Sequence, residues 1–395
     1  MSAGRAILVL NAGSSSLKFA LYDVGSALTV TARGEVENLE STPHFIARDS
    51  RGAVLRETRD ATADFAATLA GLLKFVDDHL GDSRLRAVGH RIVHGGADHI
   101  APELVTPALL DALKALIPLD LLHLPHNLAP IRALAASRPG LAQVACFDTA
   151  FHHTMPIEAS RFALPRALTT AGVRRYGFHG LSYEFIVEEL KLRVPTLARG
   201  RVVAAHLGAG ASLCALRNGV SIATTMSFSV LDGLVMSTRC GAIDPGVLLY
   251  LARQGKSFEE IEDLLYRHSG LLGVSGISGD MRALIGNDNG HAREALDLFS
   301  YRIAFEIAGL TGVLGGLEGL VFTAGIGERA PQIRADICDR LAWLGVRIDA
   351  TANASNAMRI GAPGSNIDVR VIATDEEAMI ARHTKGVVAS TKPPP

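Results

Sequence analysis

Residues 11–18 bring together the kinds of group that bind anions. Four apolar residues lead directly into Asn11, Gly13 and three serines, and Lys18 follows. Small residues let a ligand come close to the backbone, and the N–H groups of such a turn form an anion-binding surface with the serine hydroxyls. Lys18 adds a positive charge. A tight hairpin also requires small residues, so this loop taken alone fits a purely structural turn equally well.

A second segment repeats the pattern half a chain later. "AILVLNAGSSSLKFALYDVG" and "VVAAHLGAGASLCALRNG" both run from an apolar strand through one polar residue and a small-residue loop to Ser-Leu and a closing Gly. In this alignment Asn11 falls opposite His206, a separation of about 195 residues. The repeat predicts two duplicated domains, each opening with a hairpin around a glycine-rich turn, and a ligand cleft between the two copies.

A third glycine-rich segment occupies residues 320–345. Its sequence, "LVFTAGIGERAPQIRADICDRLAWLG", predicts a strand, a loop and an amphipathic helix with Pro331 near its start, whose N–H groups favour phosphate or ribose oxygens. The G-x-G-x-x-A spacing from Gly325, with Asp349 at the end of a predicted strand, also imitates the dinucleotide fingerprint of an NAD-dependent oxidoreductase. That fingerprint belongs on the first strand of a domain, and the 46 residues after Asp349 are too few for the remaining βα units.

Another apparent phosphate motif fails. Gly-Lys-Ser at residues 255–257 resembles the end of a P-loop, but Tyr250 stands where that loop requires its first Gly. The same residues instead predict that one helix ends at Gly255 and that Ser257 and Glu260 form a capping box for the next.

The composition favours a small-molecule ligand. The chain of 395 residues has a net charge of −1 and a pI near 6.9, so it has no basic field for nucleic acid. Its four cysteines are scattered, which argues against a disulfide framework or a zinc site and for a reducing compartment. Neither a signal peptide nor a membrane span is predicted, because Asn11 interrupts the first apolar run and glycines divide the run at 307–327. We therefore expect a cytoplasmic protein.

The elements that position these groups alternate between helices and strands. Residues 62–80 predict a helix with one apolar face that ends at Gly81, and Thr106 with Pro107 starts another helix. Short apolar strands recur at "RAVGHRIVHGG", "AQVACFD", "RVVAAHLGAG" and "GLVFTAG". The run at 307–327 predicts a helix end, a turn and a buried strand. The predicted fold class is α/β.

Eight strings spread from residue 11 to about residue 382 resemble the acetate kinases. They are "NAGSSSLKF", "GHRIVHGG", "ACFDTAFH", "RRYGFHG", "MSTRCGAIDPG", "SGLLGVSGISGD", "FTAGIGE" and "DEEAMIAR". The resemblance implies the sugar-kinase, Hsp70 and actin superfamily, with two ribonuclease-H-like domains and ATP in the cleft between them. The expected domains are residues 1–150, completed by a C-terminal helix over 375–395, and residues 151–374, which bind the nucleotide. A homodimer is also implied, with the apolar run at 304–317 as a candidate surface.

The reaction implied by the resemblance is reversible transfer of a phosphoryl group from ATP to acetate, giving acetyl phosphate and ADP by direct in-line displacement. The cofactor is Mg²⁺, with Mn²⁺ as an alternative. Acetate is already ionised at pH 7, so no strong general base is needed. A loose transition state then depends on positioning, the metal ion and fixed cations. A kinase for propionate or another short acid and a noncatalytic ATP-binding protein are the alternatives.

The resemblance gives several charged residues a role. Arg91 of "GHRIVHGG" would hold the substrate carboxylate, and Arg239 of "STRCG" with His179 of "GFHG" would stabilise the equatorial phosphoryl oxygens; planar guanidinium groups suit both anions. Asp148 of "CFDTAFH" matches the catalytic acid of the family. An anionic substrate does not require its proton, so Asp148 would serve equally well to orient an arginine or a metal-bound water.

Metal and nucleotide positions follow from the same strings. Asn11 and Glu376 match the magnesium-associated positions, since Mg²⁺ prefers hard oxygen ligands. Asp280 is expected at the ribose hydroxyls. The segments that correspond to nucleotide contacts are Lys18; His206, Leu207, Gly208, Ala209 and Gly210; Asp280, Met281 and Arg282; and Gly325, Ile326, Gly327, Glu328 and Arg329.

The acyl pocket departs in part from the usual family pattern. Val93 and Phe178 match its apolar wall, whereas Pro125 stands where Leu is usual and Val230 where Pro is. A pocket distinguishes one methylene by only about 1 to 3 kcal/mol, so propionate is expected to compete with acetate. His126 of "PHNLAP" matches another active-site histidine or stabilises a turn. Further departures are Ala209 in place of Asn in "HLGNG", Leu181 and Tyr183 within "FHGTSH", and Arg329 and Asp375, each in place of Asn.

Overall fold

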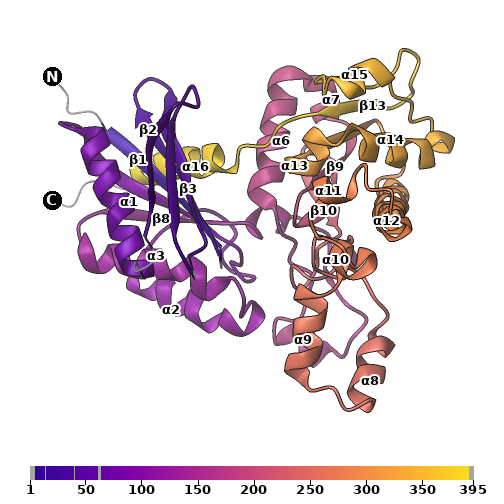
Figure 1. The fold of residues 1–395 in the computed structure, drawn as a ribbon, viewed down its shortest axis with the longest axis horizontal. Helices are drawn as coiled ribbons and strands as arrows, with labels where there is room; N and C mark the ends of the chain where they lie inside the picture. Colours follow the sequence, from indigo (N-terminus) through magenta and orange to yellow (C-terminus); the bar gives the residue numbers. More distant parts are fainter. Residues whose placement is uncertain (1–4, 14, 40, 61–63, 391–395) are drawn as a thin grey trace. The chain divides into compact units, whose positions relative to one another are not determined.

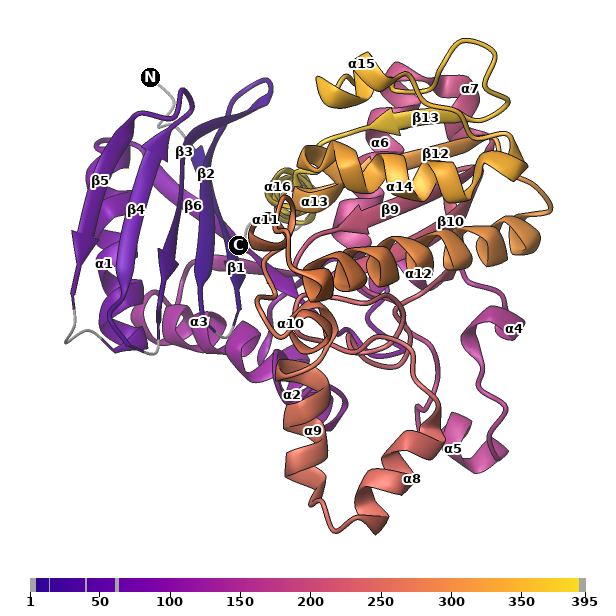
Figure 2. The same cartoon turned by 45° about the vertical axis from the view of Figure 1, so that its right-hand side comes forward.

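The computed structural model of this chain describes residues 5–13, 15–39, 41–60 and 64–390 (Figure 1). Its contacts divide the chain into two compact units. Unit 1 comprises Met1–Ala150 and Asp375–Pro395, and unit 2 comprises Phe151–Thr374. Each unit holds one β-sheet flanked by helices (Figure 2), which confirms the α/β class.

The sheet of unit 1 has eight strands in the order β5-β4-β3-β2-β1-β6-β8-β7. Neighbours from β5 to β1 pair antiparallel, β1–β6 and β6–β8 pair parallel, and β7 is antiparallel to β8. The strands are β1 (Arg5–Ala12), β2 (Leu17–Val24), β3 (Leu28–Glu37), β4 (His44–Asp49), β5 (Val54–Arg59), β6 (Arg84–Ile92), β7 (Glu103–Leu104) and β8 (Ala142–Phe147).

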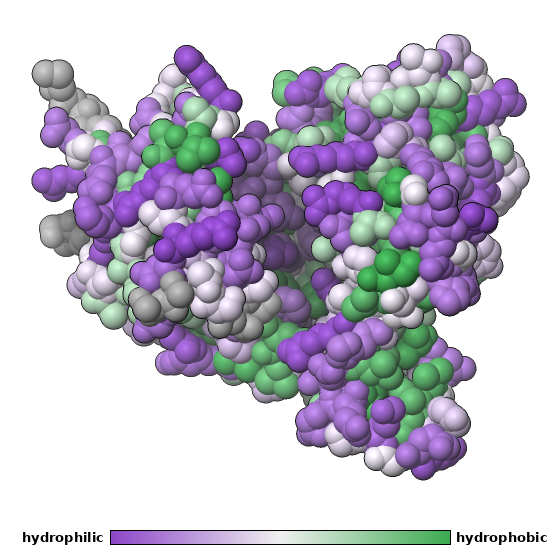
Figure 3. Space-filling view, in the orientation of Figure 1, coloured by the Kyte–Doolittle hydropathy of each residue, from purple (hydrophilic) through white to green (hydrophobic). Residues whose placement is uncertain are grey.

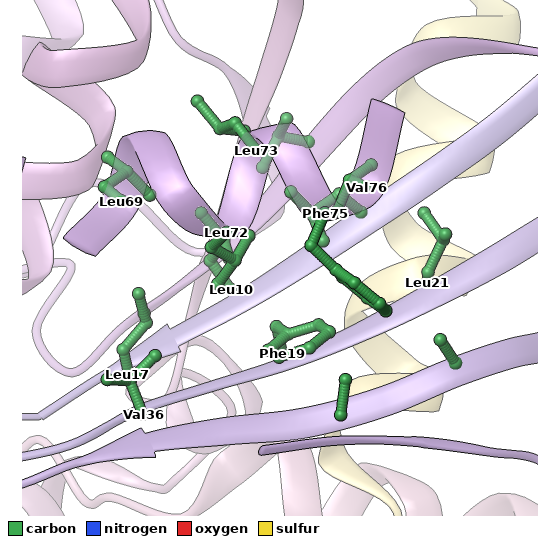
Figure 4. Close-up of a cluster of buried hydrophobic side chains, with 14 of the residues drawn as sticks. Leu10, Leu17, Phe19, Leu21, Val36, Leu69, Leu72, Leu73, Phe75 and Val76 are labelled. Carbon is green, nitrogen blue, oxygen red and sulfur yellow. The ribbon is translucent and has the colours of Figure 1, made fainter. Parts of the chain in front are cut away.

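Helices cover both faces of this sheet. Helix α1 (Phe65–Leu80) packs its apolar face on the strands, and the buried side chains include Leu10 and Phe19 from the sheet and Leu72 and Val76 from α1 (Figure 4). α2 (Pro107–Ala115), the short 3₁₀ helix η1 (Ile117–Leu119) and α3 (Leu124–Ser137) bury a second apolar cluster against β6 and β8.

The C-terminal helix α16 (Glu376–Ser390) packs on the opposite face. Successive residues of a strand point to opposite faces, and Val88 of β6 belongs to the cluster under α1 while Gly89 faces α16. A Cβ at Gly89 would lie 2.6 Å from the Cγ2 of Ile380 and 2.2 Å from the hydroxyl of Thr384. The glycine therefore lets the last helix of the chain pack directly on the first sheet, where Figure 1 shows it in yellow beside indigo strands.

The sheet of unit 2 has five strands in the order β11-β10-β9-β12-β13. β11–β10 and β10–β9 pair antiparallel, whereas β9–β12 and β12–β13 pair parallel. The strands are β9 (Arg201–Leu207), β10 (Ala211–Arg217), β11 (Val220–Thr224), β12 (Gly319–Thr323) and β13 (Asp368–Val371). Their order and directions repeat those of β3-β2-β1-β6-β8 in unit 1, as expected for two copies of one domain.

The remaining helices belong to unit 2, apart from a short 3₁₀ turn at the boundary. They are η2 (Ala150–His152), α4 (Ile157–Ser160), α5 (Arg166–Thr170), α6 (Gly180–Arg193), α7 (Pro195–Ala198), α8 (Pro245–Arg253), α9 (Phe258–Arg267), α10 (Gly270–Ser275), α11 (Met281–Leu284), α12 (Gly290–Leu314), α13 (Ala324–Arg329), α14 (Pro331–Arg340), η3 (Ala342–Leu344) and α15 (Ala350–Ala354). Exposed apolar side chains, among them Leu249 and Phe258, lie on α8 and α9 (Figure 3).

Most local predictions are confirmed. α1 ends at Gly81, whose φ of 54° lies in the region that favours glycine, although residues 61–63 at the predicted start lie outside the described residues. Thr106 caps α2 with Pro107 in its first turn, and Ser257 and Glu260 form both hydrogen bonds of the capping box on α9. The run at 307–327 is the end of α12, a turn and the fully buried β12.

Two local predictions are wrong. The segment after β12, predicted as a loop, is the short helix α13, which starts at Ala324 with a φ of 64°. Asp349 does not end a strand; its carboxylate accepts a hydrogen bond from the N–H of Ala352 and so caps α15. The strand that would carry the dinucleotide fingerprint is also the fourth of its sheet in chain order. The structure therefore removes the sequence basis for an NAD site.

Candidate active site

In unit 1, four predicted site residues come from three neighbouring strands and one helix. Asn11 lies near the end of β1, Arg91 near the end of β6, and Asp148 directly after β8, while Glu376 begins α16. β1, β6 and β8 are parallel, so their carboxyl ends meet at one edge of the sheet. This is the edge at which ligands usually bind in α/β proteins.

Arg91 is the centre of this group. Its Nε donates to the Oδ1 of Asp148 at 3.2 Å, and its Nη2 donates to the other carboxylate oxygen. Nη1 donates to the Oδ1 of Asn11 at 3.4 Å, and Nε lies 3.9 Å from a carboxylate oxygen of Glu376. Burial disfavours the charge on Arg91, but Asp148 and Glu376 more than offset this and raise the pKa of its guanidinium. Arg91 is therefore a fixed cation in a partly acidic setting.

One acidic residue nearby, Glu377, is also perturbed. Burial, together with the neighbouring Glu376, raises the pKa of the Glu377 carboxyl, which Lys18 partly opposes. Lys18 pairs with Asn11 across the β1–β2 hairpin. Within the described residues, no three His, Cys, Asp or Glu side chains form a group that could hold a metal ion by themselves.

Unit 1 also holds two predicted acyl-pocket residues, Val93 and Pro125, and the predicted active-site histidine His126. Val93 follows β6 and is buried, while Pro125 and His126 lie in the first turn of α3 and are partly buried. Asn127, which the sequence analysis did not single out, holds this region together. Its Oδ1 accepts from the N–H of Val93 at 2.8 Å, and its Nδ2 donates to the carbonyl of Ala12 at 2.7 Å. A buried amide thus ties the end of β1 to the end of β6.

In unit 2, the predicted residues gather at the β9–β10 turn. A Cβ at Gly210 would lie 3.0 Å from the Nη2 of Arg239 and 3.4 Å from the Nε2 of His179. The N–H of Gly208 donates to the carbonyl of Gly210 at 3.0 Å, and Ala209 at the tip is exposed. A side chain at Gly210 would press against Arg239 and His179, so these two side chains approach the backbone of the turn closely.

Arg239 is held by its neighbours. Its Nη1 donates to the carbonyl of Val230 at 2.7 Å, and Val230 itself is buried. The N–H of Ser237 donates to the carbonyl of Ala209, and the hydroxyl of Ser237 donates to the carbonyl of Gly279, beside Asp280. The Arg239 loop is thereby connected both to the β9–β10 turn and to the start of α11.

His179 stands at the start of α6 with a left-handed backbone (φ 57°). Its ring stacks on His206 with centroids 4.0 Å apart and planes 14° apart. His179 Nδ1 lies 2.8 Å from the hydroxyl of Ser212, and His206 Nδ1 lies 2.8 Å from the hydroxyl of Ser182. Each imidazole therefore has its own serine partner.

Phe178, the predicted apolar wall of unit 2, is buried and is anchored by a histidine that the sequence analysis missed. His152 Nε2 bonds the carbonyl of Phe178 at 2.9 Å, and its Nδ1 bonds Ser221 at 2.8 Å. Burial lowers the pKa of His152 to about 4, so its ring is neutral at pH 7. A Cβ at Gly177 would lie 2.6 Å from the His152 ring, which explains why the loop before His179 carries glycine there.

The third predicted nucleotide segment forms α13. A Cβ at Gly208 would lie 3.8 Å from the Cβ of Ala324, so α13 begins beside the β9–β10 turn. Gly325 and Arg329 are exposed, Gly327 is buried, and Ile326 and Glu328 are intermediate. Glu328 accepts a hydrogen bond from the N–H of Thr374 at 3.1 Å.

A buried arginine fixes the end of α13. Arg334 is fully buried and donates to the carbonyl of Gly327 at 2.8 Å, and its other N–H groups bond Asn353 and Asn356. Burial without a carboxylate partner among these bonds lowers the pKa of Arg334. Its spacing from "GIGE" gave no signal that could have identified it.

The last predicted nucleotide residues, 280–282, lie at the start of α11, where Asp280 has a local structural role. Asp280 caps α11 by accepting from the N–H of Arg282, and its carboxylate also pairs with the guanidinium of Arg282. Both side chains are exposed, while Met281 between them is buried. Asp280 is thus a helix cap whose outer face remains accessible.

Among the helices of the described residues, none combines the length and hydropathy that crossing a bilayer requires.

Comparison with known proteins gives one consistent result. The model of the acetokinase family matches residues 6–382. An acetate kinase of Rhodopseudomonas palustris (strain TIE-1) is 53% identical over 386 residues, which cover 95% of this chain and 97% of that protein. An acetate kinase of Rhizobium meliloti is 45% identical, with 98% of this chain covered.

Solved structures agree. A propionate kinase from Francisella tularensis superposes with a TM-score of 0.90 at 36% identity, and an acetate kinase from Porphyromonas gingivalis with a TM-score of 0.87 at 34% identity. Each comparison covers 97% of this chain and 100% of the other. The chain therefore belongs to the acetokinase family, and it is a kinase whose phosphoryl acceptor is a carboxylate.

Proposed function

We propose that this protein is an acetate kinase, which reversibly transfers the terminal phosphoryl group of ATP to acetate and forms acetyl phosphate and ADP. Family membership over residues 6–382 supports the reaction. The observation that carries the assignment of residues is the convergence of Arg91, Asp148, Asn11 and Glu376 at one sheet edge. We take units 1 and 2 as the two domains, with residues of both taking part in the reaction.

Arg91 binds the carboxylate of acetate. The guanidinium presents several N–H donors in one plane, which suits a carboxylate. Asp148 accepts from two of these donors and so fixes the plane, while Asn11 fixes a third. Because acetate is ionised at pH 7, Asp148 need not act as a proton donor or acceptor. We assign it the role of orienting Arg91.

Arg239 and His179 stabilise the phosphoryl group in transit. The transition state of phosphoryl transfer is loose, with charge spread over the equatorial oxygens. Both side chains approach the small-residue turn at Gly210, and small residues let an anion come close to the N–H groups of a turn. Loss of one fixed donor to such a charge costs about 100- to 1000-fold in kcat. In-line transfer directly from ATP to acetate needs no side-chain nucleophile.

ATP and ADP bind through backbone turns and helix ends. We assign their phosphates to Lys18 and to the turn of residues 206–210, and their nucleoside to residues 280–282 and 325–329. Small residues at Gly208 and Gly325 leave the backbone accessible, and Asp280 has an accessible carboxylate for ribose hydroxyls.

Mg²⁺, or Mn²⁺ in its place, fits the donors around Arg91. Mg²⁺ binds few protein carboxylates and keeps contacts with water and substrate phosphates, so the absence of a closed acidic cluster within the described residues agrees with it. Asn11 and Glu376 would hold the ion, directly or through water. When bound, the ion neutralises phosphate charge.

Propionate is the main alternative substrate. The neighbour with a TM-score of 0.90 is a propionate kinase, and the residues that we assign to the acyl chain, Val93, Phe178 and Val230, are each buried and apolar. A pocket distinguishes two substrates that differ by one methylene, such as propionate and acetate, by only about 1 to 3 kcal/mol. We therefore expect turnover of both acids.

We further propose a homodimer in the cytoplasm. The helix α12 exposes Tyr301, Phe305 and Val313, and α8 exposes further apolar side chains that a second subunit would cover. Four free cysteines and the use of ATP support the location.

The test is a panel of short carboxylates incubated with the purified protein, ATP and Mg²⁺, with hydroxylamine trapping any acyl phosphate. We expect acetyl hydroxamate in the highest yield and measurable propionyl hydroxamate. The absence of an acyl hydroxamate from every short acid would overturn the proposed function. A yield from propionate above that from acetate would shift the assignment to the alternative.

A further inference from the structure

We propose that Tyr183 and Ser212 hold the ring of His179 as the neutral tautomer with its proton on Nε2. The residues that bring this about come from α6 and β10 of unit 2. The functional meaning of the tautomer rests on the proposed role of His179 as a donor to the phosphoryl group. The hydrogen-bond arrangement itself does not depend on that role.

The three polar groups form a short chain. The hydroxyl of Tyr183 lies 2.5 Å from the hydroxyl of Ser212, which lies 2.8 Å from Nδ1 of His179. Both distances are well within the hydrogen-bonding range. Tyr183 and Ser212 are each fully buried, so no solvent offers a substitute partner. Burial also raises the pKa of Tyr183 well above its ordinary value, so the phenol keeps its proton.

The number of available protons decides which group donates in each of these two hydrogen bonds. The phenol of Tyr183 has one proton to donate, and the hydroxyl of Ser212 lies within hydrogen-bond distance of it. Because a buried phenol proton without an acceptor is costly, Tyr183 directs its proton toward Ser212. Having accepted from Tyr183, the Ser212 hydroxyl donates to Nδ1 of His179.

An Nδ1 that accepts a hydrogen bond carries no proton. The neutral ring of His179 must then be protonated on Nε2, and Nε2 is the atom that approaches the turn, 3.4 Å from a Cβ at Gly210. The reverse arrangement, with Nδ1–H donating to Ser212, would send the Ser212 proton to Tyr183. The phenol proton would then lack the acceptor that Ser212 provides, which is costly in a buried site.

The stacked ring of His206 has a different environment. Its Nδ1 faces Ser182, whose hydroxyl donates to the hydroxyl of Thr374 at 2.9 Å. Ser182 therefore accepts from Nδ1–H of His206, which leaves that ring with the opposite tautomer. Two parallel imidazoles with centroids 4.0 Å apart also disfavour simultaneous protonation. The pair thus offers one donor and one acceptor rather than two like charges.

Tyr183 is one of the positions where this chain departs from the usual family string. A phenol has a single proton and a fixed charge state at neutral pH, whereas an imidazole can donate from either nitrogen. With Tyr at this position, the hydrogen bonds therefore run in one direction, from Tyr183 to Ser212 and from Ser212 to His179. We infer that Tyr183 and Ser212 are positioning residues, which act through His179 and do not touch the substrates.

The test combines NMR and kinetics on the full-length protein. ¹⁵N-histidine labelling distinguishes protonated from unprotonated ring nitrogens, and His179→Gln identifies the signals of His179. In the substrate-free protein at pH 7.5, we expect Nε2 protonated and Nδ1 unprotonated. Tyr183→Phe removes the donor while keeping the ring, and it should turn the His179 signals into a mixture of tautomers. Ser212→Ala should have the same effect.

Matched variants separate this from a general loss of structure. Ser182→Ala removes the serine that bonds His206 and should leave the His179 tautomer unchanged. Tyr250→Phe makes the same substitution at an exposed phenol on α8 and should also leave it unchanged. Kinetically, Tyr183→Phe should lower kcat about 3- to 10-fold and leave the KM for acetate nearly unchanged, a loss confined to the transition state. His179→Gln should lose about 100-fold or more.

The outcomes are distinct. A proton on Nδ1 of His179 in the wild-type protein overturns the proposal, whatever the variants do. An Nε2 proton that Tyr183→Phe and Ser212→Ala both leave fully in place also overturns it, because the tautomer then has another cause. The expected tautomer in a protein that forms no acyl phosphate would uphold this arrangement while the proposed function fails.

Discussion

The carboxylate of Asp148 is fully buried and accepts hydrogen bonds from two nitrogens of the same guanidinium, Nε and Nη2 of Arg91. This pairing fixes the plane of the arginine and leaves its remaining N–H donors at the carboxyl edge of the sheet. Asp148 is therefore assigned to orientation, and its replacement is expected to act through Arg91.

Asp148→Asn tests that assignment. The amide retains the shape but loses the charge, and one of its two polar atoms becomes a donor that opposes the guanidinium. We expect kcat/KM for acetate to fall about 100-fold, as a small misplacement of a binding group can cause. Asp77→Asn, which breaks an exposed pair with Arg138, is the control and should stay near wild type. A value close to wild type for Asp148→Asn would contradict the orienting role.

Asn127→Ala tests the connection between β1 and β6. Removing the amide leaves the N–H of Val93 and the carbonyl of Ala12 without their buried partner. At roughly 1 to 3 kcal/mol for each unsatisfied group, we expect the free energy of unfolding in urea to drop by about 2 to 4 kcal/mol. The KM for acetate should rise because Val93 loses its support. Asn287→Ala, at an exposed amide, serves as the control. An equal loss of unfolding free energy in that variant would contradict a specific role for Asn127 in connecting β1 and β6.

Three buried histidines predict how stability depends on pH. Burial lowers the pKa of His90, His94 and His152 to about 4 each. The unfolded chain binds protons at these residues near pH 6.5, whereas the folded chain does not until about pH 4, so unfolding takes up protons between these values. Their stabilising contribution is complete above pH 6.5 and is lost as the pH falls toward 4, with each residue contributing on the order of 3 kcal/mol.

Urea unfolding at a series of pH values measures this. We expect the free energy of unfolding to decrease from pH 6.5 to pH 4, and His90→Asn to show a shallower decrease because one of the three groups is gone. His268→Asn, at an exposed histidine, should keep the wild-type slope. A free energy that stays constant or rises over this interval would rule the explanation out.

Ala209→Asn tests the β9–β10 turn as a phosphate site. Ala209 is exposed and does not have a positive φ, so an Asn side chain fits without strain. An added amide donor to a charged phosphate contributes about 1.5 kcal/mol, and the KM for ATP should fall about tenfold with the KM for acetate unchanged. Ala209→Leu, which adds size without a donor, should not reproduce the decrease. If it does, the effect comes from bulk rather than from a hydrogen bond.

The sequence predicted the two hairpins and the repeat because they depend on local patterns. The small residues of each turn, the Thr106 and Ser257 caps and the glycine that ends α1 all act over a few neighbouring positions. The resemblance then placed Arg91, Asp148 and Arg239 through long matching strings, and the structure brings the first two into contact.

The residues that the sequence did not reveal act over long distances. Asn127 bonds Ala12, 115 residues away, and Arg334 bonds backbone on two other helices. A buried amide or a buried arginine has no characteristic spacing, so its role emerges only when the chain is folded. The segment after β12 was mistaken for a loop because its glycines suggested a turn, whereas Arg334 stabilises a short helix there.

Steady-state kinetics of Arg91→Ala and Arg91→Lys test the central claim most directly, namely that Arg91 binds the substrate carboxylate. We predict that Arg91→Ala raises the KM for acetate at least about tenfold and lowers kcat about 100-fold or more, with the KM for ATP little changed. Arg91→Lys should recover only a small part of the lost activity, because an ammonium group cannot replace the planar set of N–H donors of a guanidinium. Acetate KM and kcat both near wild type in Arg91→Ala would contradict the account.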